Sequence, residues 1–362
     1  MNISEITRQD MEFINNSLSE LDKEKLMGMN VLVTGFAGSL GYTLMHYFLL
    51  YGHELGIKKV YGIDSYIFGK PKWVERIAGS DLFDLREMDV ITGDFDFAGD
   101  ADLIFHMASL ASPVFYRKYP IETIDADVTG LRRLLDYYKQ KPIKGFLFYS
   151  SSEIYGDPHP SQIPTSEEYW GNTNTVGPRA CYDESKRFGE TLCYNFARQY
   201  DMPITVVRPF NNYGPGMRIN DQRVVADFAK AIINREDIVI YSNGKPTRTF
   251  DYIADATVGY IKCVLYGEFD VFNIGSDYPE ITILELAELY QAIGKEQFEY
   301  DRKIVFQIHS DKEYLVDNPN RRCPDITKAR KLLQYEPVIH VEQGVQRYLE
   351  YLKNSDRDEY EW

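Results

Sequence analysis

Short stretches rich in β-branched residues alternate with longer helical periods over the first 210 residues, and this alternation is the strongest constraint on the fold. Strand patterns occur in the segments MNVLVTG, KKVYGID, LREMDVITGD, ADLIFHMAS, KGFLFYS and MPITVVRPF. Helical patterns lie between them, for example over roughly 119–139 and from about residue 182. Strands joined through helices are parallel, because right-handed crossovers bring the chain back to the same end of the sheet. The sequence therefore predicts an α/β fold with a doubly wound parallel sheet.

The pattern changes after Phe210, where NNYGPGM forms a turn-rich break. The segment TRTFDYIADATVGYIKCVLYG then predicts a strand end and a helix that return to the sheet. Further helical patterns cover 223–234, 282–294, 325–334 and 342–353. We therefore expect three parts: an N-terminal helical extension (1–28), a sheet domain (29–210 plus about 246–276), and a smaller, interleaved C-terminal substrate domain (211–245 plus 277–355).

Composition excludes several classes of protein. The apolar share is 44%, yet no apolar stretch is long enough to span a bilayer, and the N-terminus has no signal-peptide core, so we expect a cytoplasmic protein. The 4 cysteines are far apart and include no C-x-x-C, which predicts neither a disulfide framework nor a metal site. A net charge of −15 disfavours nucleic acid and anionic membranes as partners. An anionic substrate would need a local basic pocket.

The turn VTGFAGSLG places Gly35, Gly38 and Gly41 between the first strand and the first helix. Glycines there let the backbone approach a pyrophosphate at the helix N-terminus, although a tight turn without a ligand is the alternative. The next strand ends in Asp64, which would accept hydrogen bonds from a ribose and repel a 2′-phosphate, so NAD is favoured over NADP. Asp94, after the third strand, is placed to hold the adenine amine, or is a simple turn residue.

Two further motifs carry candidate chemistry. In YDESK, Tyr182 and Lys186 share one helix face, and an ammonium beside a phenol favours the phenolate, which suits proton transfer. A surface Tyr–Lys pair is the alternative. The segment SSSEIYGD places hydroxyls and one carboxylate, Glu153, at a strand end, where open α/β sheets bind ligands.

Together these motifs resemble the extended short-chain dehydrogenase/reductases, the NAD-dependent sugar-nucleotide epimerases, dehydratases and decarboxylases with a Rossmann fold. The glycine turn, HMAS, the serine-rich strand end, YDESK, RPFNNYGPG and TRTFDYIAD follow in that family's order over about residues 29–350. The segments SSSEIYGDP, EEYWGNTNTVGPRACYDESKR, RVVADF and RRCPDITKARKLL are similar in particular to those of UDP-glucuronate decarboxylases (UDP-xylose synthases).

The resemblance implies roles for the catalytic residues. Tyr182 would take the proton of the sugar 4-hydroxyl, Lys186 would hold the nicotinamide ribose, and Ser151 would hydrogen-bond the 4-oxygen. Glu153 would act near the sugar carboxylate together with Arg322, for which the neighbouring Arg321 is an alternative. The structural alternatives are a Glu153 tied to a nearby backbone amide and an Arg322 that caps the following helix.

The resemblance also implies binding residues for NAD and for the nucleotide sugar. Those expected at the cofactor are Gly35, Gly38, Ser39, Leu40, Gly41, Asp64, Asp94, Ala108, Tyr182 and Lys186. Those expected at the substrate are Ser152, Asn211, Arg223, Tyr241 and Arg248, with the two arginines near the diphosphate and Tyr241 near the base. Ordinary surface arginines are the alternative for either arginine alone. A homodimer packed through the helices at 119–139 and 182–200 is a further implication.

Ser152 discriminates among members of the family. At the positions that match 151–153, the 4,6-dehydratases of the resembled family have Thr-Asp-Glu, and their Asp–Glu pair eliminates water. This chain has Ser152 in place of that aspartate, so the acid–base pair for dehydration is incomplete. Simple 4-epimerases usually lack the glutamate at position 153 as well. Ser151, Ser152 and Glu153 together therefore favour decarboxylation of UDP-glucuronate, to UDP-xylose or its 4-keto precursor, over 4-epimerisation or 4,6-dehydration of a related sugar nucleotide. A catalytically silent dinucleotide sensor or scaffold is the hypothesis from another class, and the intact Tyr182, Lys186 and Ser151 argue against it.

Several residues depart from the decarboxylase pattern. Glu122, Asp125 and Asp127 stand where xylose synthases tend to have Lys and Asn. Phe36 and Ser39 in the glycine turn, and Cys323 in RRCPDI, are also unusual. Acidic residues near the cleft put the identity of the sugar nucleotide in question more than the fold or the redox chemistry.

Overall fold

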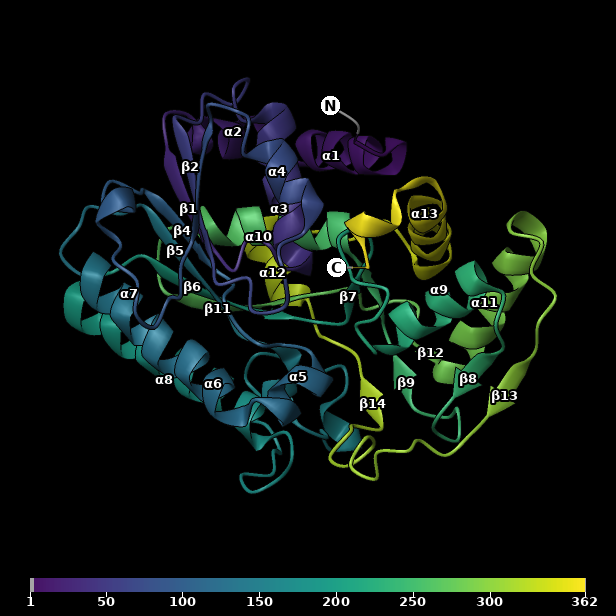
Figure 1. Cartoon of the computed structure of the whole chain (residues 1–362). Coiled ribbons are helices and arrows are strands. Elements are labelled where there is room, and N and C mark those ends of the chain that lie inside the picture. The colour runs from purple at the N-terminus through teal and green to yellow at the C-terminus, as the bar shows by residue number, and fades with distance from the viewer. Residues whose placement is uncertain (1–2, 362) are drawn as a thin grey trace.

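The computed structural model describes residues 3–361, so the first two residues of the expected N-terminal extension lie outside the described chain. Its centre is a seven-stranded, wholly parallel sheet in the order β11-β6-β5-β4-β1-β2-β3 (Figure 1). The strands are β1 (Asn30–Thr34), β2 (Lys59–Asp64), β3 (Phe83–Glu87), β4 (Leu103–His106), β5 (Gly145–Tyr149), β6 (Ile204–Pro209) and β11 (Asp270–Ile274). The predicted doubly wound parallel sheet is confirmed, and β11 is a strand that the sequence patterns did not single out.

Helices cover both faces of this sheet because its strands are apolar on both sides. The helices are α1 (Glu5–Ser17), α2 (Glu20–Leu26), α3 (Ser39–Tyr51), α4 (Lys72–Ile77), α5 (Pro113–Lys118), α6 (Pro120–Ile124), α7 (Leu131–Tyr138), α8 (Ala180–Tyr200), α9 (Val224–Asn234), α10 (Ile253–Val264), α11 (Ile283–Gln297), α12 (Thr327–Leu333) and α13 (Val341–Asn354). Along β1, Val31 and Val33 pack into the core shared with α1, α3 and α10, whereas Leu32 packs into the core shared with α7 and α8. The period of two in a strand produces this division.

The helix expected over 119–139 is interrupted. It consists of α6, a π-helical turn at Asp125–Gly130, and α7. The π turn contains Asp127, whose side chain is fully buried. Single π turns inside helices occur frequently at functional sites.

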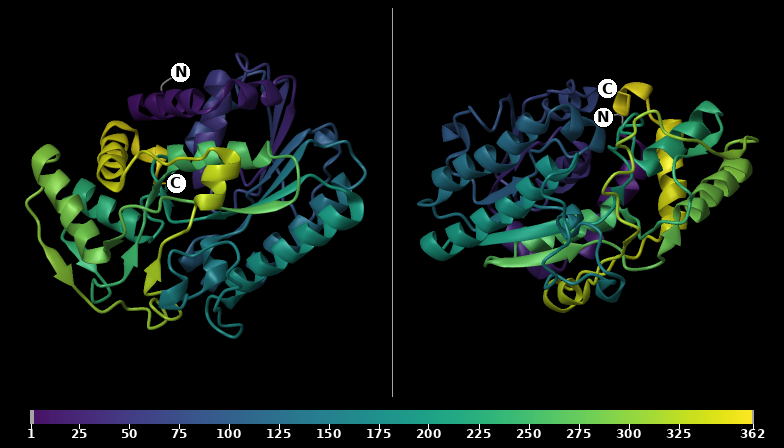
Figure 2. Two further views of the ribbon diagram at one scale, coloured as in Figure 1. Left: turned by 180° about the vertical axis from the view of Figure 1, so that it is seen from behind. Right: turned by 90° about the horizontal axis from the view of Figure 1, so that it is seen from below.

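Short strands form a second, smaller region beside the sheet (Figure 2). The pairs are β7 (Asn212–Tyr213) with β10 (Asp251–Tyr252), β8 (Ile238–Ile240) with β13 (Ile304–Phe306), and β9 (Thr247–Arg248) with β12 (Ile281–Thr282) and β14 (Arg321–Arg322). Within the predicted C-terminal domain, α12 packs against β11 and α10 of the large sheet, while α13 packs against α1 and α9. The division into domains stays a prediction.

Short 3₁₀ turns complete the chain at Asp96–Ala98, Ser152–Tyr155, Pro160–Gln162 and Arg357–Glu359. The N-terminal helix α1 lies across α3, α10 and α13 (Figure 1). There the buried Asp10 pairs with Arg347 of α13 and accepts a hydrogen bond of 2.8 Å from the Tyr252 hydroxyl. The extension therefore joins the large sheet region to the C-terminal helices.

Candidate active site

A cavity of about 570 Å³ opens where the carboxyl ends of the central strands face the smaller region. Open α/β sheets bind ligands at this edge. Apart from Asp94, every residue that the sequence analysis assigned to cofactor, catalysis or substrate lines this one cavity. These residues are Gly35, Gly38, Ser39, Leu40, Gly41, Asp64, Ala108, Ser151, Ser152, Glu153, Tyr182, Lys186, Asn211, Arg223, Tyr241, Arg248 and Arg322.

The glycine turn presents bare backbone to the cavity. Gly35 has a φ of +69°, and a Cβ there would lie 2.7 Å from the backbone of Ala108. At Gly41 a Cβ would lie 2.0 Å from the Phe36 carbonyl oxygen, so the first turn of α3 can pack tightly against the loop only without a side chain. The unusual Phe36 points into the core, where its ring contacts Tyr66 and Trp73. The N-terminus of α3 is therefore open to a pyrophosphate, as NAD binding requires.

The acid at the end of β2 is placed for a ribose. The Asp64 carboxylate accepts hydrogen bonds from the backbone N–H groups of Ala37 (3.0 Å) and Tyr66 (2.9 Å), which fix its orientation at the cavity wall. Burial raises the pKa of Asp64, and these two bonds oppose the rise. Its carboxylate oxygens retain lone pairs that can accept from ribose hydroxyls.

The structure corrects the placement of Asp94. The third strand ends at Glu87, earlier than the LREMDVITGD pattern indicated, and Asp94 lies in the following loop outside the cavity lining. Its carboxylate accepts a hydrogen bond of 2.9 Å from the N–H of Asp96, two residues on, just before a short 3₁₀ turn, which matches the simple-turn alternative. At this corner Asp89 and Ile91 line the cavity instead. Residues in a loop follow no helical or strand period, so the sequence pattern could not fix the position of Asp94.

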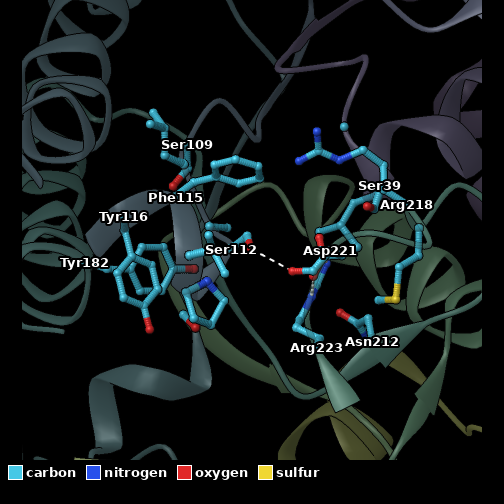
Figure 3. A pocket seen from close by; sticks show the side chains of 18 of the residues that line it. Ser39, Ser109, Ser112, Phe115, Tyr116, Tyr182, Asn212, Arg218, Asp221 and Arg223 are labelled. Atoms are coloured by element: carbon cyan, nitrogen blue, oxygen red, sulfur yellow. Dashed lines mark hydrogen bonds and ion pairs between the residues drawn. The ribbon is translucent and has the colours of Figure 1, made fainter. Parts of the chain in front are cut away.

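Tyr182 and Lys186 lie one turn apart on α8, as predicted, and both side chains are buried. The Tyr182 ring stacks on Tyr116, with centroids 5.1 Å apart (Figure 3). The Lys186 ammonium donates to the Tyr149 carbonyl oxygen (2.9 Å) and lies 5.6 Å from the centre of the Tyr182 ring. Burial raises the pKa of Tyr182, the Asp127 carboxylate adds to that rise, and a hydrogen bond with Ser151 opposes it.

Glu153 is held by two guanidinium groups. Arg322 contacts its carboxylate through both terminal nitrogens, one at 2.7 Å, and Arg179 contacts it from the start of α8. Burial acts to raise the pKa of Glu153, but Arg179 and Arg322 outweigh it and lower the pKa to about 2. Glu153 is therefore ionised and bound to side chains, not tied to a backbone amide. Arg321 points elsewhere and pairs with Glu280 at 2.6 Å.

Sequence reasoning missed Arg179. It lies three residues before Tyr182, so the helical spacing places both on one side of α8, and this spacing is the signal that could have found it. Arg179 also lies 3.7 Å from Asp183, and burial together with Glu153 raises the pKa of Asp183 to about 7. Burial and the neighbouring Arg322 lower the pKa of Arg248 to about 9. This corner of the cavity concentrates cationic groups, although the whole chain is acidic.

The wall that faces Tyr182 across the cavity carries Arg223, one of the two arginines expected at the diphosphate (Figure 3). Arg223 pairs with Asp221, and the Ser112 hydroxyl donates to the Asp221 carbonyl oxygen at 3.1 Å (Figure 3). Arg248, the other arginine, lies at the Glu153 corner, where its guanidinium donates to backbone carbonyls of Thr247, Pro319 and Asn320, at 2.6–3.3 Å.

The other residues expected at the substrate also line the cavity. Asn211 donates to the Thr249 carbonyl oxygen at 2.8 Å, and the Tyr241 ring contacts His309 and Tyr314. Ser152 is buried at the cavity wall, and Ser151 accepts a hydrogen bond of 3.2 Å from the Glu153 N–H. Of the unusual residues, Glu122, Asp125 and Ser39 line the cavity, whereas Cys323 does not.

Among residues 3–361, no three His, Cys, Asp or Glu side chains gather in a way that could hold a metal ion. Over the same residues, no helix has the length and apolarity needed to cross a membrane.

Comparisons with known proteins agree with this geometry. Residues 31–275 match the model of the NAD dependent epimerase/dehydratase family. A UDP-glucuronic acid decarboxylase 1 of Xenopus tropicalis is 35% identical over 93% of this chain and 74% of its own length. UDP-glucuronic acid decarboxylase 6 of Arabidopsis thaliana is 35% identical over 88% of this chain and 87% of its own length.

Solved structures show the same fold. The UDP-glucose 4-epimerase of Thermotoga maritima with UDP-glucose has a TM-score of 0.77 at 25% identity, over 90% of this chain and 99% of that one. The UDP-glucuronic acid 4-epimerase of Bacillus cereus, in complex with UDP-glucuronic acid and NAD, has a TM-score of 0.73 at 24% identity, over 90% and 99%. The glycine turn, Asp64 and the Tyr182–Lys186 pair fit NAD as the cofactor. The chain belongs to the NAD dependent epimerase/dehydratase family.

Proposed function

We propose that this enzyme decarboxylates UDP-glucuronate through a 4-keto intermediate. The observation that carries the proposal is the contact of Glu153 with Arg179 and Arg322 in the same cavity as Tyr182 and Lys186. The cavity thus combines Tyr182 and Lys186, which suit the oxidation of a sugar alcohol, with a cationic corner that suits a sugar carboxylate. The relatives named UDP-glucuronic acid decarboxylase support the same substrate.

The chemistry follows from the position of the ketone. Tyr182 accepts the proton of the sugar O4 as C4 is oxidised, and Ser151 orients that oxygen. Held by the glycine turn, Asp64 and Lys186, NAD would supply a reversible two-electron acceptor for the C4 hydrogen and its electron pair. The carboxylate is then β to a ketone, so the C5–C6 bond breaks, carbon dioxide leaves, and the electron pair delocalises onto O4. A proton adds at C5, and the C4 hydrogen returns to C4 with its electron pair as the Tyr182 proton returns to O4, which gives UDP-xylose. Release before this reduction would give the UDP-4-keto-pentose.

Glu153 moderates the arginines around the departing group. A carboxylate held by unopposed guanidinium groups is stabilised as the anion, which disfavours its conversion to neutral carbon dioxide. Because Glu153 already occupies part of the hydrogen-bonding capacity of Arg179 and Arg322, these side chains can orient the sugar carboxylate without binding it at full strength. Arg223 and Arg248 would hold the diphosphate, Asn211 the sugar–phosphate side, and Tyr241 the base.

A 4-epimerase acting on the same sugar is the alternative, because oxidation at C4 needs the same Tyr182, Lys186 and Ser151. The buried Ser152 supports the first proposal over dehydration, since the position that would carry an acid for water elimination carries a hydroxyl.

The deciding experiment follows UDP-glucuronate labelled with carbon-13 in its carboxyl group, with NAD present, by NMR. We expect release of labelled carbon dioxide and formation of a UDP-pentose by the wild type. Tyr182→Phe should release labelled carbon dioxide at least about a hundredfold more slowly. If the label remains in a UDP-hexuronate with inverted C4, the protein is an epimerase and the decarboxylase proposal is wrong.

We also propose a homodimer formed through the helices at 119–139 and 182–200, which in the structure are α6, the π turn and α7, and α8. Ile121 of α6 is 65% exposed and Phe188 of α8 is 50% exposed, and these two helices pack side by side. Packing Ile121 and Phe188 against a second copy would remove their apolar surface from water. Light scattering at micromolar concentration should give the mass of two chains, and Phe188→Glu should give the mass of one.

A cytoplasmic location stays a prediction, which the four free cysteines favour.

A further inference from the structure

The π turn between α6 and α7 places a carboxylate against the lysine of the catalytic pair. The Asp127 Oδ1 lies 3.0 Å from the Lys186 Nζ, and its Oδ2 accepts a hydrogen bond of 2.9 Å from the Ser185 hydroxyl. Asp127 is 0% exposed and Lys186 is 3% exposed. An ion pair in such a place interacts far more strongly than one in water. The sequence departure at residue 127 therefore lies directly behind the catalytic pair, although Asp127 itself does not line the cavity.

Other charged and titratable groups face Tyr182 and Lys186 at longer range. They are Glu153 from the 3₁₀ turn after β5, Tyr116 from α5, Arg223 at the start of α9, Arg179 and Asp183 from the N-terminal end of α8, and His106 from β4. Burial lowers the pKa of His106 to about 3, so that ring is neutral. Glu153 and Asp183 are engaged by Arg179, as described above. Asp127 is the carboxylate in direct contact with the Lys186 ammonium.

We propose that Asp127 is a positioning residue that fixes Lys186 and neutralises its charge, so that Tyr182 holds its proton more tightly and the oxidised, cationic nicotinamide is favoured over the neutral reduced form. The part of this inference that concerns the sugar product rests on the proposed function. A lone ammonium would stabilise phenolate and repel a cationic ring, and the Asp127 carboxylate cancels both effects. The consequence is a bias toward giving the C4 hydrogen back, so that the sugar leaves reduced and not as a 4-keto product.

Asp127→Asn tests the charge with little change of shape. The amide oxygen can lie against Lys186, and the amide N–H can donate to the Ser185 hydroxyl, which keeps the Tyr182 carbonyl oxygen as its own acceptor. The primary readout is the rate at which sodium cyanoborohydride, a hydride donor, reduces the enzyme-bound nicotinamide, followed at 340 nm without any sugar. We expect this rate to rise about tenfold, the factor that corresponds to one pKa unit. The acidic limb of the pH profile of kcat/KM should move down by about one pH unit. A larger fraction of the product should be released as the 4-keto sugar.

Asp136→Asn is the matched control. Asp136 lies on α7 and also pairs with a lysine, Lys139, at 2.9 Å, but at the surface, so its loss should change none of these readouts. The double variant Asp127→Asn/Lys186→Met removes both charges, and its cyanoborohydride rate should return to within about threefold of the wild type.

Equal rates and pH profiles for Asp127→Asn and the wild type would overturn the inference, and so would a double variant as fast as Asp127→Asn. The cyanoborohydride assay requires only bound NAD. If no carbon dioxide is released from UDP-glucuronate and the rate still rises, the proposed substrate is wrong while the role of Asp127 stands. If carbon dioxide is released and the rate does not change, the role of Asp127 is wrong and the proposed function stands.

Discussion

Replacing Arg322 with methionine tests which of two adjacent arginines acts in the cavity, a choice that the sequence alone left open. Both lie on β14 and both pair with a glutamate, Arg322 with Glu153 inside the cavity and Arg321 with Glu280 outside it. The Arg322 side chain is 6% exposed, whereas that of Arg321 is 43% exposed. Methionine keeps much of the aliphatic volume of arginine and removes the charge, so Arg321→Met is the matched control.

The expected magnitudes follow from burial. Removing one partner of a buried ion pair costs about 3–5 kcal/mol. Because Arg179 still contacts Glu153, we expect the lower end for Arg322→Met, about 3 kcal/mol in the free energy of unfolding. An exposed pair such as Arg321–Glu280 contributes less than about 1 kcal/mol. If the same guanidinium orients the sugar carboxylate, a loss of about 3 kcal/mol of transition-state stabilisation corresponds to about a hundredfold decrease in kcat/KM.

Urea unfolding at pH 7 and steady-state decarboxylation of UDP-glucuronate measure the two quantities. We expect Arg322→Met to lose both stability and kcat/KM, and Arg321→Met to keep kcat/KM within about threefold. Similar losses of activity in both variants, or an Arg322→Met enzyme as active as the wild type, would refute the assignment of Arg322 to the carboxylate corner. A loss of stability without a loss of activity would show that Arg322 only supports Glu153.

Three further predictions concern the cofactor, the proton and the pH dependence of stability. Tyr182→Phe removes only the hydroxyl, so kcat should fall by about 10²–10⁴, while the dissociation constant of NAD measured by calorimetry stays within about threefold. Gly35→Ala places a Cβ 2.7 Å from Ala108 at a φ of +69°, and NAD affinity should fall at least about tenfold in the same measurement. Because the pKa of Glu153 is lowered from 4.5 to about 2, its ion pairs stabilise the fold fully above about pH 5, and this contribution is lost as the pH falls toward 2. Urea unfolding from pH 5 to pH 2 should therefore cost the wild type about 3 kcal/mol more than Glu153→Gln; equal slopes would contradict the assignment.

Local patterns were enough to predict the sheet, the glycine turn and the Tyr182–Lys186 pair. Strand and helix periods depend on neighbouring residues, and a spacing of four fixes which side chains share a helix face. The same reasoning misplaced Asp94, because the loop after β3 has no period that fixes where each residue lies. It also treated 119–139 as one regular helix, since nothing in a helical period announces a π turn.

The sequence by itself determined the doubly wound sheet, the dinucleotide turn and the residue types available for chemistry, because these follow from local geometry and from the chemistry of each side chain. Only the tertiary structure decided which charges meet. Arg179 and Arg322, 143 positions apart, both contact Glu153. Asp127, in the π turn between α6 and α7, contacts Lys186 on α8. Such contacts depend on how distant elements pack. In a buried site, a displacement of a few ångströms decides whether an opposite charge is a partner or is absent.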